Sequence, residues 1–188
     1  MLTGGFIMKN DLSLWQFGGF AISSLGGSLL HFLYNWTNKS VLVAPFSAIN
    51  ESTWEHMKLL FFPMLIFAII QSLFFKDTEN FWSIKLTGIL TGIILIPVLF
   101  YTLNGVFGKY PEWINIAIFF IATAIAYLVE TRLFKTKIRA SVSNLFAFII
   151  IVGIGILFVV FTFFTPKLPI FKDPVTSTYG TEWVTRIH

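Results

Sequence analysis

Five long stretches of this chain contain no Asp, Glu, Lys or Arg, and they limit its possible folds more than any other feature. The stretches cover residues 12–38, 59–75, 86–108, 113–129 and 140–166. A helix needs about 20 apolar residues to cross the roughly 30 Å hydrocarbon layer of a membrane. Charged residues make up only 12% of the chain, whereas about 25% is typical of soluble domains. The sequence therefore predicts an integral membrane protein.

Helices are the expected form of these spans, because a backbone surrounded by lipid must satisfy its own hydrogen bonds. We predict an all-α fold, a polytopic transmembrane helical bundle of about five helices. The two stretches of 17 residues are short, so their helices must include flanking charged residues. The predicted helices lie near residues 12–34, 53–75, 82–105, 111–134 and 141–165. We expect the bundle to occupy residues 1–165 and residues 166–188 to form an extracytoplasmic C-terminal tail packed on the outer face.

Basic residues gather on one side of the predicted spans, and cytoplasmic loops carry an excess of Lys and Arg. The clearest group is Arg132, Lys135, Lys137 and Arg139, around the 133–140 connection. Placing this connection in the cytoplasm puts seven basic residues inside and three outside before the tail. We therefore predict a multi-pass plasma-membrane protein with a cytoplasmic N-terminus and an extracytoplasmic C-terminus. The same rule accounts for the net charge of +4, so the expected partners are membrane lipids and not nucleic acid.

The first predicted span carries small residues every four positions, at Gly19, Ser23 and Gly27, and His31 continues the series. Small residues at this spacing let a second helix approach closely. We expect Gly27 to contact another helix and His31 to point toward a partner helix, away from lipid. Three roles stay open for His31: a hydrogen bond to a neighbouring helix, a ligand-binding or catalytic role, and a solvated position at the interface.

The second predicted span begins with a helix-capping pattern, in which Ser52 precedes Glu55 by three residues just before an apolar run. Asn50 is the alternative cap. If Ser52 caps the helix, Glu51 lies outside it and its carboxylate is free to turn inward. Glu55 and Lys58 can pair at i, i+3. The alternative is that these charged residues are simply exposed to water at the N-terminal end of the helix.

His31 and His56 are expected at similar depth near the outer surface, on helices joined by a short loop, with Glu51 or Glu55 as a third group. Imidazole and carboxylate groups are suitable zinc ligands, so the cofactor that this pattern indicates is a divalent metal such as zinc. We predict that His31, Glu51 and His56 are the catalytic residues and also the metal ligands. The complete zinc-hydrolase patterns H-E-x-x-H and H-x-x-E-H do not occur in the chain.

Other polar groups give weaker indications. The predicted substrate-binding residues of the same pocket are Glu55, Tyr101 and Asn104. Glu130 lies toward the opposite end of the fourth span, and we expect Arg132 or Lys135 to pair with it in a structural role. The chain contains no Cys, which excludes disulfides, thiolate metal sites and cysteine nucleophiles.

Four segments carry a resemblance to a known family. They read H-F-L-Y-x-W at 31–36, P-F-S-x-I-N-E-S-T-W-E-H-M-K-L-L-F-F-P at 45–63, Y-T-L-N-G-V-F-G-K at 101–109 and F-K-D-P-V-T-S-T-Y-G at 171–180. The chain resembles a family of small polytopic membrane proteins, mostly of Gram-positive bacteria, that is described only as a domain of unknown function. The resemblance covers most of the chain, and N-E-S-T-W-E-H is its most specific string. It implies a bacterial plasma-membrane protein and supplies no activity.

Three functions from different classes remain. The first is a membrane-embedded hydrolase in which His31, Glu51 and His56 hold a metal ion, or act as acid and base, on a lipid-like substrate. The second is a binding or transport protein that holds a small solute in the same pocket under the C-terminal tail. The third is an accessory membrane subunit whose polar groups only join helices. The sequence favours the hydrolase slightly, because ionisable residues gather on one side of the membrane. The sequence does not determine the oligomeric state.

Overall fold

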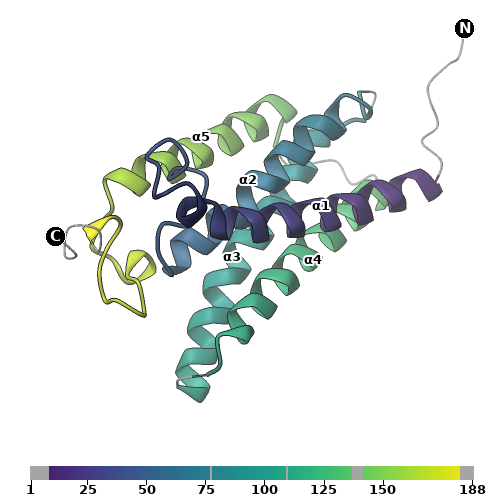
Figure 1. Ribbon diagram of the computed structural model, residues 1–188. Helices are drawn as coiled ribbons and strands as arrows, with labels where there is room; N and C mark the ends of the chain where they lie inside the picture. Colours follow the sequence, from purple (N-terminus) through teal and green to yellow (C-terminus); the bar gives the residue numbers. More distant parts are fainter. Residues whose placement is uncertain (1–8, 77, 109, 137–141, 183–188) are drawn as a thin grey trace, which may run out of the picture.

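The computed structural model describes residues 9–76, 78–108, 110–136 and 142–182. The described part consists of five α-helices and a short 3-10 helix (Figure 1). They are α1 (Lys9–Trp36), α2 (Thr53–Ser72), α3 (Phe81–Phe107), α4 (Trp113–Thr136), α5 (Asn144–Phe163) and η1 (Pro169–Phe171). The described residues form no strand, and an isolated antiparallel bridge joins Lys172 to Tyr179. The predicted all-α bundle is therefore confirmed, and each predicted helix overlaps an observed one.

Four of the five helices, α2 to α5, are long and apolar enough to cross a membrane. The remaining helix, α1, has 28 residues and is therefore about 42 Å long. It does not reach the same apolar content, so the structure supports the predicted first span by length alone. Small and polar residues on its packed face, including Gln16, Ser23 and Ser24, account for the difference.

Helix α2 forms the centre of the bundle. It contacts α1, α3, α4, α5 and η1. In its most apolar stretch of 18 residues, 67% of the residues are buried, whereas 22% are buried in the corresponding stretch of α5. Its side chains Leu60, Phe61 and Met64 are almost completely covered. Figure 1 shows α5 against one side of the bundle, with α1 and α4 on another. Burying this apolar core stabilises α2 against its neighbours and holds its N-terminal end in place.

The small residues of α1 form the contact surface for α2 and α4, as their spacing predicts. A β-carbon at Gly27 would lie 2.5 Å from the carbonyl oxygen of Leu59 and would also collide with the Phe119 ring. A β-carbon at Gly19 would lie 2.6 Å from the Phe67 ring. The Ser23 hydroxyl lies 2.8 Å from the hydroxyl of Tyr127 on α4. The expectation that Gly27 contacts another helix closely is confirmed.

Glu130 pairs with a different residue from the one expected. Its carboxylate lies 2.6 Å from the Lys85 ammonium group on α3, and both side chains are buried. Arg132 and Lys135, the partners expected from the sequence, are exposed on α4. They project from other sides of the helix, because successive residues are rotated by about 100°. The structural role fits the geometry, but the expected partner is wrong.

Burial of Lys85 also changes the charge count behind the predicted orientation. Lys85 belongs to the seven basic residues assigned to the cytoplasmic side, and Lys58 to the three on the other. Both are buried in ion pairs, so six basic residues remain against two, and the direction of the prediction is unchanged. Lys137 and Arg139 among the six, and Lys109 among the two, lie outside the described residues.

Gly27→Leu is expected to destabilise the bundle, because the new side chain has no space between α1, α2 and α4. Overpacking of this kind costs about 1–3 kcal/mol. Thermal unfolding of the purified protein in detergent measures the loss. Gly18→Leu on the same helix is the matched control, since a β-carbon at Gly18 meets nothing within 4 Å. Equal melting temperatures for the two variants would contradict this packing of α1.

Candidate functional site

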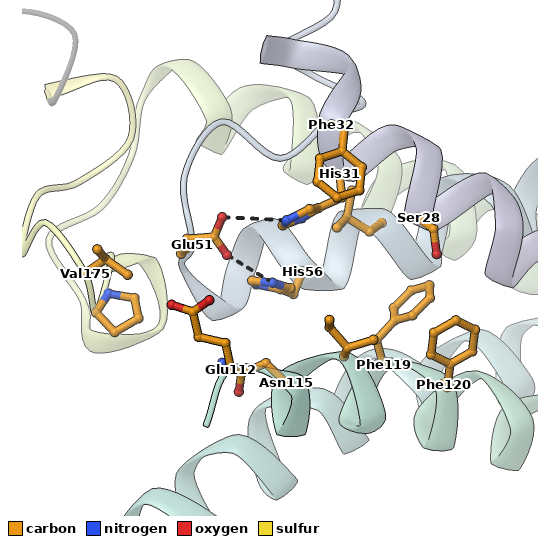
Figure 2. A pocket seen from close by; sticks show the side chains of 14 residues that line it. Ser28, His31, Phe32, Glu51, His56, Glu112, Asn115, Phe119, Phe120 and Val175 are labelled. Carbon is orange, nitrogen blue, oxygen red and sulfur yellow. Dashed lines mark ion pairs between the residues drawn. The ribbon is translucent and has the colours of Figure 1, made fainter. Parts of the chain in front are cut away.

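A cavity of about 400 Å³ lies where the C-terminal part of α1 meets the N-terminal ends of α2 and α4 (Figure 2). The residues after η1 reach its rim through Pro174 and Val175. Its size lies within the range of small-molecule binding sites, about 300–1,000 Å³. The residues that line it are Gly27, Ser28, His31, Phe32, Glu51, His56, Leu59, Glu112, Asn115, Ile116, Phe119, Phe120, Pro174 and Val175.

Glu51 joins the two histidines at the polar end of this cavity. One carboxylate oxygen lies 3.7 Å from Nε2 of His31, and the other lies 3.5 Å from Nε2 of His56. The two imidazole ring centroids are 5.7 Å apart. Figure 2 shows the Glu51 carboxylate beside both rings, with one nitrogen of each ring directed toward it. The structure thus brings together His31, Glu51 and His56, which the sequence analysis selected as the candidate site.

The cap of α2 explains why Glu51 can turn toward the histidines. Ser52 is the N-cap, and its hydroxyl accepts a hydrogen bond from the Glu55 backbone N–H at 3.4 Å. The Asn50 side chain accepts one from the Ser52 backbone N–H. Asn50 also donates to the carbonyl oxygen of Gly180, which ties this turn to the C-terminal tail. Glu51 therefore precedes the helix, and none of these bonds uses its carboxylate.

The capping residue also orients His56. Its Nδ1 lies 3.0 Å from the backbone carbonyl oxygen of Ser52. A carbonyl oxygen can only accept, so in the neutral imidazole the hydrogen lies on Nδ1 and the lone pair of Nε2 is available. Such a bond to the second ring nitrogen is the usual way in which proteins orient a metal-binding histidine. The nitrogen that faces Glu51 and His31 is therefore a suitable ligand or proton acceptor.

The three side chains have suitable geometry for one divalent ion. Each offers a ligand atom, and the three atoms lie within 4.8 Å of one another. Two ligands of a tetrahedral zinc ion, each about 2 Å from the metal, are roughly 3.4 Å apart. The contacts from Glu51 to the imidazole nitrogens, 3.7 Å to His31 and 3.5 Å to His56, are close to this value, but they come from different oxygens of the carboxylate. One ligand atom from each residue lies within 4.8 Å of the other two, so the three must move closer together to bind an ion. Small rotations of these partly exposed side chains would complete the arrangement.

Glu55 lies outside the cavity, in a buried ion pair. Its carboxylate lies 2.6 Å from the Lys58 ammonium group, three residues along α2, so the expected i, i+3 pair is confirmed. The same carboxylate accepts a hydrogen bond from the Ile49 backbone N–H. Exposure to water at the helix end, the alternative interpretation, fits Glu51, whose side chain is 48% exposed. It is wrong for Glu55 and Lys58, whose side chains are at most 3% exposed.

Tyr101 and Asn104 also lie away from this cavity, since neither is among the residues that line it. The Asn104 amide donates to the carbonyl oxygen of Phe100 and to the hydroxyl of Tyr110. The Tyr110 hydroxyl donates in turn to the side-chain oxygen of Asn115. Asn104 is therefore two hydrogen bonds away from a residue of the cavity wall. Tyr101 is 42% exposed on the surface of α3.

Glu112 and Asn115 are candidate site residues that the sequence analysis missed. Both line the cavity, where α4 begins, and Figure 2 shows the Glu112 carboxylate directed toward the His56 side. Helices that alternate in direction place the start of α4 at the same end of the bundle as the end of α1 and the start of α2. This alternation, together with an acidic residue at a helix start, is the sequence signal that could have identified Glu112.

Zinc binding should depend on His31, Glu51 and His56. We expect the purified protein to hold one equivalent of zinc, and His31→Ala or His56→Ala to weaken binding by more than about 100-fold. That loss would exceed the 10–100-fold caused by removing an outer-shell partner. Elemental analysis and competition with a chelator give these values. Glu79→Gln, which removes an exposed acid from the connection between α2 and α3, is the control. Retention of full affinity by both histidine variants would exclude a zinc site in this cavity.

Glu55→Ala is expected to destabilise the protein by about 3–5 kcal/mol, because it leaves the buried Lys58 ammonium group without its carboxylate. Glu51→Ala is the contrasting variant, and we expect it to cost less than about 1 kcal/mol, as for a partly exposed ion pair. Unfolding in detergent measures both. Replacing the pair together, with Glu55→Ala and Lys58→Met, should restore part of the loss. Equal stability of the two single variants would contradict the structural role of Glu55.

Comparison with known proteins gives a family and no activity. The model of a family of unknown function, DUF6512, matches residues 6–181. No curated protein and no solved structure matches this chain. The matched range includes all five α-helices and every residue that lines the cavity, and it extends through the tail residues that reach the cavity rim. The chain belongs to DUF6512, a family of unknown function.

Proposed function

We propose that this membrane protein is a metal-dependent hydrolase whose active site is the His31, Glu51 and His56 cluster, acting on a lipid-like substrate. The observation that carries the proposal is the position of the cluster. Three ligand atoms that fit one divalent ion face a cavity large enough for a substrate. The proposal places this end of the bundle at the outer face of a bacterial plasma membrane, as the charge pattern and the family resemblance suggest.

Zinc is the metal that suits this donor set. Two imidazole nitrogens and one carboxylate are a common ligand set of catalytic zinc ions, which keep the fourth position open for water or substrate. A structural zinc site would instead provide four protein ligands. When bound, the ion would polarise the substrate carbonyl group and supply an easily deprotonated water molecule. The open side of the cluster, toward the cavity, supports the catalytic role.

Glu112 is suited to move the proton in this reaction. It lines the same cavity but is not one of the three residues whose ligand atoms cluster. In ester hydrolysis the water oxygen forms a bond to the carbonyl carbon, and the bond from that carbon to the alcohol oxygen breaks. Glu112 would accept the proton of the attacking water and return it to the departing alcohol oxygen. Asn115, on the next part of α4, would offer a hydrogen bond to a polar group of the substrate.

The substrate is inferred from the composition of the wall. Phe32, Leu59, Ile116, Phe119 and Phe120 give the cavity a large apolar surface beside its polar end. Ligand sites of this kind combine apolar walls with a small number of polar groups that orient the ligand. A substrate with both an apolar part and a hydrolysable polar bond fits both ends. The alternative, binding of a small solute beneath the tail, is supported by the position of Pro174 and Val175 at the rim.

Hydrolysis of acyl esters and amides presented in detergent micelles tests the proposal. We expect zinc-dependent release of free acid, abolished by a chelator and by His56→Ala. Glu112→Gln should lower kcat by about 10²–10⁴, the usual contribution of acid–base catalysis, while leaving the zinc content unchanged. Glu79→Gln is again the matched control. A zinc-bound protein without hydrolytic activity that retains a water-soluble ligand through purification would favour the solute-binding alternative over the hydrolase.

A further inference from the structure

The cavity has two chemically different ends. His31, Glu51, His56, Glu112 and Asn115 lie toward the ends of the helices. The apolar end lies deeper between α1 and α4, and it is lined by Gly27, Ser28, Leu59, Ile116, Phe119 and Phe120. Phe32 borders the opening beside His31. Figure 2 shows Phe119 and Phe120 extending from α4 toward α1, on the side of the histidines away from Val175. A ligand that fills the whole cavity must therefore be polar at one end and apolar at the other.

We propose that the apolar end is a subsite for the single hydrocarbon chain of a one-chain amphiphile, which enters sideways from the bilayer between α1 and α4. This inference rests on the proposed function for the role of the polar end, and it names the substrate class of that same site. The polar head of the amphiphile would lie at the Glu51 carboxylate and the two imidazole rings, and its chain would extend toward Phe120.

The surface of α1 in the subsite is apolar although it includes a serine. The Ser28 hydroxyl donates a hydrogen bond to the backbone carbonyl oxygen of Ser24 at 2.9 Å, so its hydrogen is used within its own helix. Gly27, one residue earlier, contacts the Phe119 ring and the Leu59 carbonyl oxygen closely enough to exclude any side chain. This contact closes the inner end of the subsite, while the small size of Ser28 leaves it open beside α1.

The side of the subsite that faces away from α2 is open. Phe32, Ile116 and Phe120 line the cavity and are also 50%, 59% and 38% exposed, respectively. In Figure 1, α1 and α4 diverge toward the ends that form the cavity. Large apolar side chains at the edge of such an opening indicate a ligand groove or contact with lipid. On a membrane-spanning bundle, this edge faces the hydrocarbon layer, from which an acyl chain can enter without crossing water.

The dimensions favour one chain over two. From Trp113 to Phe120, α4 rises about 10 Å, at 1.5 Å per residue, which is less than half of the roughly 30 Å hydrocarbon layer. The whole cavity measures about 400 Å³, near the lower limit for ligand sites. The polar head must occupy part of this space. The remainder suits part of one chain, with its far end in the bilayer.

A photoreactive lysophosphatidylcholine, with a diazirine in its single acyl chain, tests the inference in phosphatidylcholine nanodiscs. The chain should crosslink to residues of α1 and α4 that line the cavity. Ser28→Trp and Ile116→Trp should each reduce labelling about tenfold or more, because they fill the space of several methylene groups. Leu29→Trp and Ile121→Trp are the matched controls. Leu29 and Ile121 are apolar and about half exposed on the same helices, and neither lines the cavity.

Three outcomes would overturn the inference. The first is equal labelling of the parent and the cavity variants, and the second is an equal loss of labelling in the two control variants. The third is competition by glycerophosphocholine, which has no acyl chain, that is as strong as competition by unlabelled lysophosphatidylcholine. Zinc content is measured on the same samples, and Ser28→Trp should leave it unchanged. If the parent holds no zinc but the cavity variants alone lose labelling, the hydrolase proposal fails and the chain subsite stands. If zinc binds but the cavity variants are labelled as strongly as the parent, the chain subsite fails and the hydrolase proposal stands.

Discussion

The buried contact between Glu55 and Lys58 holds together the parts of the molecule on which the candidate site depends. The Lys58 ammonium group bonds to the Glu55 carboxylate, to the carbonyl oxygen of Ala44 and to the hydroxyl of Thr162. The carboxylate accepts a further hydrogen bond from the Ile49 backbone N–H. One ion pair thus connects α2 with α5 and with both ends of the segment that leads from residue 44 to residue 49. A buried charge requires such partners, because its desolvation is costly unless it is paired and hydrogen-bonded.

The position of Glu51 follows from this contact. Because Ile49 is held by Glu55, and Ser52 caps α2, the two residues between them, Asn50 and Glu51, form a short turn with little freedom. The Asn50 side chain accepts a hydrogen bond from the Ser52 backbone N–H within the turn and donates one to the carbonyl oxygen of Gly180 in the C-terminal tail. The Glu51 carboxylate makes none of these bonds, and it faces the two imidazole rings. Its role in the proposed site therefore depends on a structural pair that never enters the cavity.

The candidate site and the helix packing use one series of residues along α1, and Gly27 belongs to both. Gly19, Ser23 and Gly27 bring α1 against α2 and α4, and His31 follows one turn later on a similar side of the helix. Close packing at Gly27 sets the inner limit of the cavity, and divergence of α1 from α4 beyond it creates the space. A polar cluster next to an apolar subsite is the arrangement expected for an amphiphilic ligand at a membrane surface. The proposed hydrolase and its chain subsite both use this arrangement.

Four features could be predicted from the sequence: the helical bundle, its approximate helix bounds, the close contact at Gly27 and the selection of His31, Glu51 and His56. These features follow from the length of apolar stretches and from the spacing of residues along one helix, which are local properties. Other features became evident only once the helices were packed: Lys85 pairs with Glu130, Glu55 is buried, Asn104 bonds to Tyr110, and Glu112 lines the cavity. Each of these depends on how one helix is rotated and shifted against another. Local sequence does not encode that geometry, because it results from the packing of all the helices together.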